Sequence, residues 1–368
     1  MASIPEKIQT WQMVQPPVFN KETKEVTPGK LEKCEIPVPE PEKGEVLVKV
    51  AGCGVCHTDL SYFYEGTPTV SAPPLTLGHE ISGTVAAGDE QWIGKEVIIP
   101  AVMPCRRCIL CKTGHGNRCL SQKMPGNSLG IYGGFSDYIP VPSIDLCVIN
   151  DRKGIPLPFF AALADAGTTP YQAAKRADLK YGDRVIIIGI RGGVGKFMGL
   201  IASALGAGTV IGIDIKDDID DALDMGADFV ISSRGRDIKA VSDEFKKICK
   251  ENSLPRHGWK IFEVSGSVPG QNLGLSLISF LSTMIVVGYN NKKVEYSISR
   301  LMAFEAGIRG TWGCLPEYYP DVLEMVLKGK IPLTDLVETR PMSTISETFE
   351  ENHKNPPDRR IVLTPDFQ

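Results

Sequence analysis

Residues 183–215 of the chain read DRVIIIGIRGGVGKFMGLIASALGAGTVIGIDI and decide its architecture. A continuous apolar run is followed by a glycine-rich turn, an Ala/Leu/Ile-rich segment and a second apolar run that ends at Asp214. Apolar runs without alternation are typical of strands buried on both faces of a parallel sheet. Glycines let the backbone approach a pyrophosphate, a helix N-terminus offers free N–H groups, and the acid binds ribose hydroxyls. The stretch therefore predicts an α/β Rossmann domain, a doubly wound parallel sheet with a dinucleotide site.

The candidate cofactor residues in this turn are Gly192, Gly193, Val194 and Gly195. A glycine pattern alone often occurs by chance, but here a strand precedes it, a helix follows it, and Asp214 comes nineteen residues after Gly195. The turn departs from G-x-G-x-x-G, because Ile190 stands where the first glycine would fall. Asp214 would repel a 2′-phosphate, so we predict NAD rather than NADP as the cofactor.

A compact cysteine cluster is the most specific signal in the chain. Its members are Cys105, Cys108, Cys111 and Cys119. Four thiolates at this spacing can surround one zinc ion tetrahedrally and leave no open position, which predicts a structural zinc. The alternatives are four unrelated thiols or an iron–sulfur site.

The stretch AGCGVCHTDL at residues 51–60 carries a second group of chemically active side chains. Cys56 and His79 could hold one zinc ion, since zinc takes Cys sulfur and His nitrogen and a catalytic site keeps one position open. Thr58 would stand beside that position and could take a proton from an alcohol. Most Cys and His residues are merely packed or exposed, so this pair alone decides nothing.

The composition narrows the class of protein. The chain has 368 residues, of which 44 are acidic and 40 basic, so the net charge is −4. This balance argues against a nucleic-acid surface and a polybasic membrane anchor. No apolar run approaches the length of a membrane span, and the start MASIPEKIQTWQ has no signal-peptide core. We therefore expect a cytoplasmic protein without nucleic-acid or membrane partners.

The pattern of predicted helices and strands changes near residue 155, which indicates a domain boundary there. Residues 1–156 are turn-rich with short strands, as in a partly open β-barrel, and we predict that the mixed segment 308–368 folds back onto them. Residues 157–307 are predicted to form the Rossmann domain, beginning with an Ala-rich helical stretch at 160–178.

Together these residues resemble the zinc-dependent medium-chain alcohol dehydrogenases over the whole chain. The resemblance implies a GroES-like catalytic domain followed by a Rossmann domain, with the C-terminal tail rejoining the first. Three segments resemble one subfamily in particular, the 6-hydroxycyclohex-1-ene-1-carbonyl-CoA dehydrogenases of anaerobic benzoyl-CoA degradation. These segments are IQTWQMVQPP, PAVMPCRRCILC and KMPGNSLGIYGGFSDYI.

The resemblance assigns a third ligand to the catalytic zinc. Cys56 and His79 match the first two ligands, and the third falls at Asp165, where many relatives have cysteine. From sequence alone a helix N-cap is the preferred interpretation of Asp165, and only the family position reverses it. Asp59 matches a carboxylate that orients His79. Glu80 matches an acidic neighbour of the metal, although it could be a plain surface glutamate.

The remaining matches concern the proton and the cofactor. Thr58 matches the hydroxyl that takes the substrate proton. Ser61 stands where many relatives carry the relay histidine, so we expect the proton to leave through Ser61 and water. His57 and Arg360 match pyrophosphate-binding positions. Thr169 and Val287 match positions that touch the nicotinamide.

The implied reaction is hydride transfer from a cyclic secondary allylic alcohol, 6-hydroxycyclohex-1-ene-1-carbonyl-CoA, to NAD, which gives the 6-oxo enone. One alternative within the fold is a general secondary alcohol, polyol or threonine dehydrogenase. Others are a conjugate enone reductase, a zinc-free quinone oxidoreductase, and a non-catalytic protein that kept the fold. The resemblance also implies a homodimer or homotetramer and two zinc ions per subunit.

Overall fold

The computed structural model describes residues 4–367 except 21, 24, 217 and 218. The chain forms two compact units. The first unit comprises Met1–Thr168, Gly313–Leu327 and Pro332–Gln368, and the second comprises Thr169–Trp312 and Lys328–Ile331. The first unit extends beyond residue 156, where the sequence suggested its end, because the 3₁₀ helix η2 (Leu157–Ala164) packs against strands of this unit.

The second unit is built on a parallel sheet with the strand order β13-β12-β11-β14-β15-β16 among its described residues. These strands are β13 (Phe229–Ser232), β12 (Thr209–Asp214), β11 (Arg184–Ile188), β14 (Trp259–Glu263), β15 (Thr283–Val286) and β16 (Gly307–Gly310). The order corresponds to the 3-2-1-4-5-6 arrangement of a Rossmann fold, as the sequence predicted. β11 pairs in parallel with β12 and β14, and its Val185, Ile186 and Ile187 are fully buried, which explains its unbroken apolar run.

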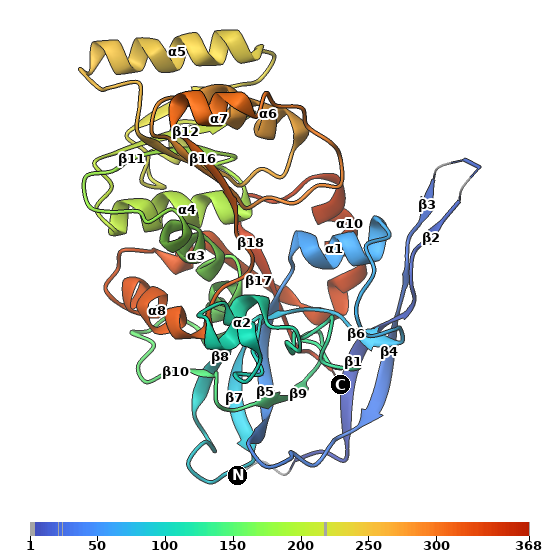
Figure 1. Cartoon of the computed structure of the whole chain (residues 1–368). Helices are drawn as coiled ribbons and strands as arrows, with labels where there is room; N and C mark the ends of the chain where they lie inside the picture. Colours follow the sequence, from blue (N-terminus) through green and yellow to red (C-terminus); the bar gives the residue numbers. More distant parts are fainter. Residues whose placement is uncertain (1–3, 21, 24, 217–218, 368) are drawn as a thin grey trace. The chain divides into compact units, whose positions relative to one another are not determined.

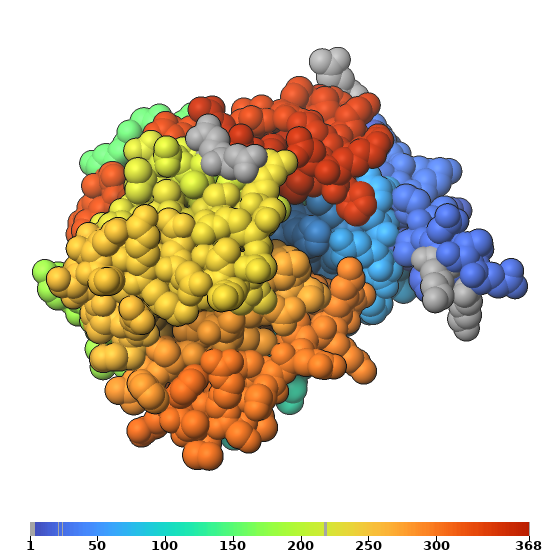
Figure 2. Space-filling view, turned by 90° about the horizontal axis from the view of Figure 1, so that it is seen from above, coloured from blue at the N-terminus to red at the C-terminus, as the bar shows by residue number. Residues whose placement is uncertain are grey.

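The helices of the second unit cover both faces of this sheet. They are α3 (Thr168–Arg176), α4 (Gly193–Ala204), α5 (Ile238–Glu251), α6 (Val268–Leu277) and α7 (Ser299–Phe304). α5 and α6 lie on one face and α4 on the other (Figure 1). Val241, Phe245 and Cys249 recur every four residues and form the buried stripe of α5. The opposite, charged side of α5 forms part of the surface drawn in yellow and gold in Figure 2.

The first unit has a larger, mixed sheet with the order β10-β8-β7-β5-β18-β17, and β9 also pairs with β5. The strands are β10 (Cys147–Ile149), β8 (Glu96–Ile99), β7 (Glu80–Ala87), β5 (Glu45–Gly54), β18 (Arg360–Thr364), β17 (Val337–Pro341) and β9 (Tyr138–Pro142). Val46, Val48 and Val50 of β5 point into one core cluster, as their alternation predicted. The C-terminal strand β18 pairs with β5, so the tail does fold onto the first unit.

A second, smaller sheet of this unit has the order β4-β1-β6, and a separate hairpin joins β2 to β3. The strands are β1 (Lys7–Gln15), β4 (Lys30–Pro37), β6 (Leu75–Thr76), β2 (Val18–Phe19) and β3 (Val26–Thr27). The α-helices of the first unit are α1 (His57–Tyr64), α2 (Ile109–Lys112), α8 (Tyr319–Leu327), α9 (Leu333–Leu336) and α10 (Ile345–Lys354). Among the described residues, no helix has the length and apolar character that a bilayer crossing requires.

Candidate active site and metal centres

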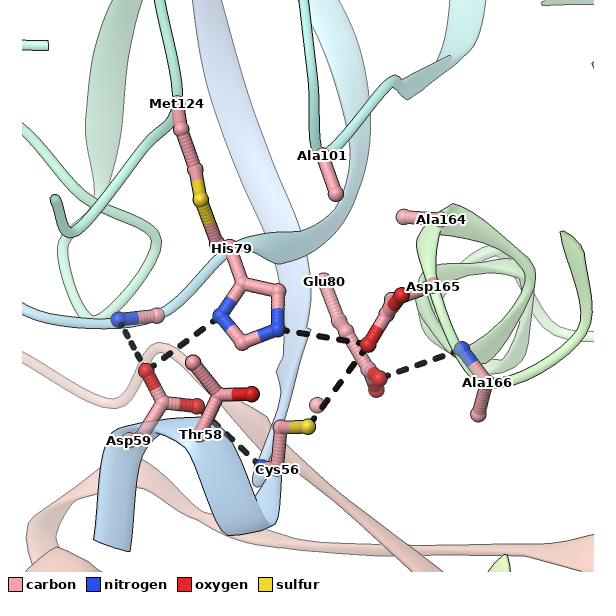
Figure 3. A network of polar contacts seen from close by, with 12 residues as sticks. Cys56, Thr58, Asp59, His79, Glu80, Ala101, Met124, Ala164, Asp165 and Ala166 are labelled. Carbon is pink, nitrogen blue, oxygen red and sulfur yellow. Dashed lines mark hydrogen bonds and ion pairs between the residues drawn. The ribbon is translucent and has the colours of Figure 1, made fainter. Parts of the chain in front are cut away.

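Cys56, His79 and Asp165 meet within the first unit, although they come from three separate parts of the chain (Figure 3). Cys56 is the N-cap of α1, His79 immediately precedes β7, and Asp165 follows the last residue of η2. The Sγ atom of Cys56 lies 3.6 Å from Oδ2 of Asp165, and Nε2 of His79 lies 3.5 Å from the same oxygen. The position of Asp165 excludes the helix N-cap alternative, because it ends a helix instead of starting one.

These separations fit one zinc ion. Zinc binds sulfur at about 2.3 Å and nitrogen or carboxylate oxygen at about 2.0–2.2 Å, so two ligands of one tetrahedral ion lie about 3.3–3.8 Å apart. Both measured separations fall in that range. Donor atoms from Cys56, His79, Glu80 and Asp165 all lie within 4.8 Å of one another. The donor set therefore suits a zinc ion bound by sulfur, imidazole and carboxylate.

The carboxylate of Asp59 contacts the backbone around both Cys56 and His79. Its Oδ2 accepts the backbone N–H of Cys56 at 3.2 Å, and its Oδ1 accepts the N–H of Gly78 at 3.0 Å. Oδ1 also lies 3.4 Å from Nδ1 of His79, so Nε2 is turned toward Asp165. Burial by itself lowers the pKa of His79, but the charge of Asp59 and contacts with Asp165, Asp59 and Cys56 raise that pKa well above its ordinary value. A bound cation would replace the proton that these anionic neighbours attract.

Glu80 is completely buried and is therefore not a surface glutamate. Its carboxylate binds the guanidinium of Arg360, whose Nε donates to Oε2 at 2.9 Å and whose second nitrogen donates to Oε1. Oε1 also accepts the N–H of Ala166 at 3.2 Å. Burial raises the pKa of Glu80, and Arg360 opposes that rise. The guanidinium of Arg360, which the sequence assigned to a pyrophosphate, is thus engaged by Glu80.

The three residues around Cys56 that were assigned to cofactor or proton transfer have different environments. Thr58 is half-buried and lies beside Cys56 and Asp59 (Figure 3). His57 is exposed, with Nε2 3.4 Å from Oε1 of Glu65. The Ser61 hydroxyl is buried and donates to the Thr58 carbonyl at 2.9 Å. A relay through Ser61 would first have to break this bond.

The cysteine cluster forms a second candidate metal centre, around α2 and the following 3₁₀ turn. Sγ separations are 3.4 Å for Cys108–Cys111, 3.8 Å for Cys108–Cys119 and 4.0 Å for Cys105–Cys111. Four sulfurs at about 2.3 Å from one zinc would be about 3.8 Å apart, which agrees with these values. Backbone N–H groups of Cys111 and Leu120 lower the pKa of Cys108 to about 6, so this thiol readily becomes the thiolate that zinc binds.

In the second unit the glycine turn connects β11 to α4. Gly189 has φ +90°, which favours glycine, and Gly192 is the N-cap of α4. A Cβ on Gly195 would lie 2.0 Å from the Gly189 carbonyl oxygen, so only glycine allows the helix to approach the turn this closely. Ile190 is buried and packs over Gly212 of β12, which gives the unusual residue of this turn a packing role.

Asp214 ends β12 and points back at this turn. Its Oδ2 accepts the N–H of Arg191 at 2.9 Å, and its Oδ1 accepts the N–H of Ile215 at 2.8 Å. Val287 follows β15, where its N–H donates to the Glu263 carbonyl at 2.9 Å, and Thr169 lies in the first turn of α3. The structure thus places Asp214 against the turn that holds Gly192, Gly193, Val194 and Gly195.

The sequence reasoning did not single out Tyr319. This residue is fully buried at the start of α8, and its hydroxyl accepts the N–H of Ala101 and donates to the carbonyl of Ala164, the residue before Asp165. No motif surrounds it, and its partners are more than 150 residues away in the chain. No local sequence pattern could therefore have indicated these contacts.

Comparison with known proteins agrees with this arrangement. Residues 42–151 match the family model of the alcohol dehydrogenase GroES-like domain, and residues 193–328 match that of the zinc-binding dehydrogenase. An alcohol dehydrogenase of Geobacillus stearothermophilus is 32% identical over 340 residues, which cover 90% of this chain and 95% of that protein. A sorbitol dehydrogenase of Bombyx mori is 29% identical over 331 residues, 86% of this chain and 90% of that protein.

Among solved structures, that of acetophenone reductase from Geotrichum candidum in complex with NAD has a TM-score of 0.79 and 25% identity, and the match covers 99% of this chain and 98% of that one. The fold, the two groups of metal-binding donors and the dinucleotide turn therefore agree with the family matches. The chain's cofactors are NAD and zinc, and it oxidises alcohols in the broad sense that includes polyols. The chain belongs to the zinc-dependent medium-chain alcohol dehydrogenase family.

Proposed function

We propose that the chain oxidises a cyclic secondary alcohol at a zinc ion held by Cys56, His79 and Asp165, with a CoA thioester as its substrate class. The position of Asp165 is the main support for this set of zinc ligands, because its Oδ2 lies 3.6 Å from the Cys56 sulfur and 3.5 Å from the His79 nitrogen. One thiolate, one neutral imidazole and one carboxylate together balance the two positive charges of zinc.

When bound, zinc supplies Lewis-acid polarisation of an alcohol or carbonyl oxygen, and NAD supplies the hydride acceptor. The chain supplies orientation and proton handling. Asp59 fixes the imidazole of His79, and the hydroxyl-bearing Thr58 of α1 lies beside Cys56 in Figure 3. We assign Thr58 as the group that accepts the alcohol proton.

The onward path of that proton is a separate proposal. The Ser61 hydroxyl is buried and already donates to the carbonyl of Thr58, so its present contact supports α1 rather than a relay. We infer that the proton leaves Thr58 without passing through Ser61. We also propose that His57, whose side chain is exposed at the start of α1, binds the pyrophosphate, and that Arg360 takes part while it stays paired with Glu80.

Support for the CoA thioester comes from the chain's own segments. The stretch KMPGNSLGIYGGFSDYI, which resembles the cyclohexenyl-CoA dehydrogenases, begins at Lys123, and its Gly134 donates its N–H at 2.8 Å to the carbonyl of Gly78, the residue before His79. Within it, Asn127 donates to the Tyr62 hydroxyl at 2.6 Å and accepts the N–H of Val70 at 2.8 Å. This segment therefore helps to shape the surroundings of the metal.

The second candidate is a general secondary alcohol or polyol dehydrogenase, which the similarity to alcohol and sorbitol dehydrogenases favours. Initial rates of NADH formation separate the two. We expect a higher kcat/KM for 6-hydroxycyclohex-1-ene-1-carbonyl-CoA than for sorbitol, cyclohexanol or 2-butanol. A preference for sorbitol would overturn the CoA assignment, and NADH consumption with a conjugated enone-CoA that yields the saturated ketone would indicate conjugate reduction.

We also propose a homodimer or homotetramer joined through the second unit. β16 is the edge strand of its sheet. Ile298, just before α7, is 72% exposed, and Met302, within α7, is 79% exposed. An open strand edge next to exposed apolar side chains favours pairing with a second copy. Sedimentation analysis would test this, and a monomer at micromolar concentration would contradict it. A cytoplasmic location fits the thiolate metal cluster, since reducing compartments keep such cysteines free.

A further inference from the structure

Asp165 differs from the other two metal-binding residues in how its backbone is held. Cys56 caps α1, and Asp59 accepts the backbone N–H of Gly78, the residue before His79. Asp165 instead follows the end of η2 with φ −139° and ψ −62°, outside the helical region, and the bond from the Gly167 N–H to the Ala162 carbonyl at 2.9 Å spans it without binding its own peptides. A metal ligand must keep its donor atom within a few tenths of an ångström, so something else must fix this backbone.

Two buried side chains hold the peptides on either side of Asp165. The Tyr319 hydroxyl donates to the carbonyl of Ala164 and accepts the N–H of Ala101 at 3.0 Å. On the other side, the N–H of Ala166 donates to Glu80 at 3.2 Å. Ala101, Ala164 and Ala166 all lie close to Asp165 in Figure 3.

We propose that Tyr319 is a positioning residue of the catalytic metal site, which fixes the backbone of Asp165 so that its carboxylate stays within coordination distance of the metal bound by Cys56 and His79. This inference rests on the proposed function, in which Asp165 is a zinc ligand. Tyr319 acts through Ala164 and does not touch the metal.

The contacts of Tyr319 distinguish this role from simple packing. Its ring fills buried space that phenylalanine would fill equally well, but only the hydroxyl joins Ala101, in the loop after β8, to the segment before Asp165. Burial raises the pKa of Tyr319 well above its ordinary value, so the hydroxyl keeps its proton and remains a donor to Ala164. Without the hydroxyl, the buried N–H of Ala101 loses its partner, and the Ala164 carbonyl keeps only the longer bond from the Thr168 hydroxyl at 3.3 Å.

The test compares Tyr319→Phe with wild-type enzyme through metal binding. After the catalytic metal is removed by dialysis, Co²⁺ is titrated back, and its dissociation constant and visible d–d bands are measured. Residues that support ligands indirectly change metal affinity by about 10–100-fold, and we expect about 10-fold weaker Co²⁺ binding with shifted bands. Tyr138→Phe is the matched control, because Tyr138 is a buried tyrosine of the same unit in a separate cluster with Ile8 and Leu47.

Each outcome identifies which statement fails. Wild-type affinity and bands in Tyr319→Phe would overturn the role of Tyr319. If Asp165→Asn also binds Co²⁺ as wild-type enzyme does, the ligand set of the proposed function fails instead. If Asp165→Asn loses the metal while Tyr319→Phe does not, only the positioning inference fails.

A second measurement applies if Tyr319→Phe does not fold, as judged by loss of zinc from the cysteine cluster. Hydrogen exchange of the peptide covering residues 157–167 is then followed in the wild-type zinc enzyme. We expect slow exchange at Ala166 and its neighbours, because both flanking peptides are held by buried side chains. Exchange as fast as that of exposed loops would overturn the inference.

Discussion

Arg360 in the last strand and Glu80 at the start of β7 are 280 residues apart in the chain, yet they form a buried two-point ion pair beside Asp165, the proposed metal ligand. The Glu80 side chain is completely buried and the Arg360 side chain is 11% exposed. Glu80 also holds the N–H of Ala166. The pair therefore connects the C-terminal strand to the segment that carries Asp165.

Replacing Arg360 with methionine should destabilise the first unit. The variant leaves the carboxylate of Glu80 buried without its partner, which costs about 3–5 kcal/mol in comparable buried pairs. Urea unfolding, followed by a probe in the first unit, measures this loss. Arg340→Met is the control, because Arg340 forms more exposed pairs with Glu338 and Glu351 and should cost about 1 kcal/mol or less. Equal losses in the two variants would contradict the prediction.

Replacing Asp165 with cysteine should retain the catalytic zinc. This change introduces the ligand that the resemblance attributes to many relatives, and the thiolate balances the same charge. A softer ligand leaves zinc a weaker Lewis acid, so we expect normal zinc content and a lower kcat. Zinc analysis and steady-state rates measure the two effects. Asp165→Ala is the control and should lose the catalytic zinc; retention of all zinc in that variant would argue against Asp165 as a ligand.

Replacing Thr58 and Ser61 separately should give different results. Thr58→Val removes the proposed proton acceptor, and we expect kcat to fall by about 10²–10⁴-fold. Ser61→Ala removes a hydroxyl that donates to the Thr58 carbonyl, so we expect kcat to change by less than about 3-fold and the pH profile to stay in place. Thr58→Ser should recover most of the activity. A large loss in Ser61→Ala would restore the relay that the sequence suggested.

Acid should release zinc from the cysteine cluster. The pKa of Cys108 is about 6 because backbone N–H groups of Cys111 and Leu120 stabilise its thiolate, whereas burial raises the pKa of Cys111 to about 12. Protons compete with zinc for these thiolates, so zinc affinity should fall as the pH decreases, most steeply once Cys108 also takes up a proton below about pH 6. A zinc-binding dye added between pH 5 and 8 measures the release.

The same experiment in Cys56→Ala, which removes one ligand of the catalytic site, assigns the released ion to the cluster. Release that did not depend on pH would contradict thiolate coordination. Loss of this zinc should also make the segment 105–119 sensitive to protease, because the ion cross-links a loop that contributes few side chains to the core.

Replacing Asp214 with glycine should weaken NADH binding and allow NADPH to bind. The carboxylate can accept bonds from ribose hydroxyls and repels a 2′-phosphate, and a charged hydrogen bond contributes about 1.5–3 kcal/mol. We therefore expect an NADH dissociation constant about 10–100-fold higher, measured by fluorescence titration without substrate. Asp243→Asn on the surface of α5 is the control. Unchanged discrimination between NADH and NADPH would place the specificity elsewhere.

The sequence by itself determined the fold class and the local motifs. The strand–turn–helix–strand series at 183–215 predicted the Rossmann sheet, because hydrophobic period and glycine positions are local properties of the chain. The spacing of Cys105, Cys108, Cys111 and Cys119 predicted their convergence for the same reason, since ligands a few residues apart must lie close together.

Only the tertiary structure showed how distant residues meet at the catalytic site. Asp165 could have been a helix cap, Glu80 a surface residue and Ser61 part of a relay, and nothing local distinguished these possibilities. The pairing of Glu80 with Arg360 and of Tyr319 with Ala164 depends on strand register and on the packing of η2. Such contacts join segments more than 150 residues apart, and their partners are selected by the folded core, not by neighbouring sequence.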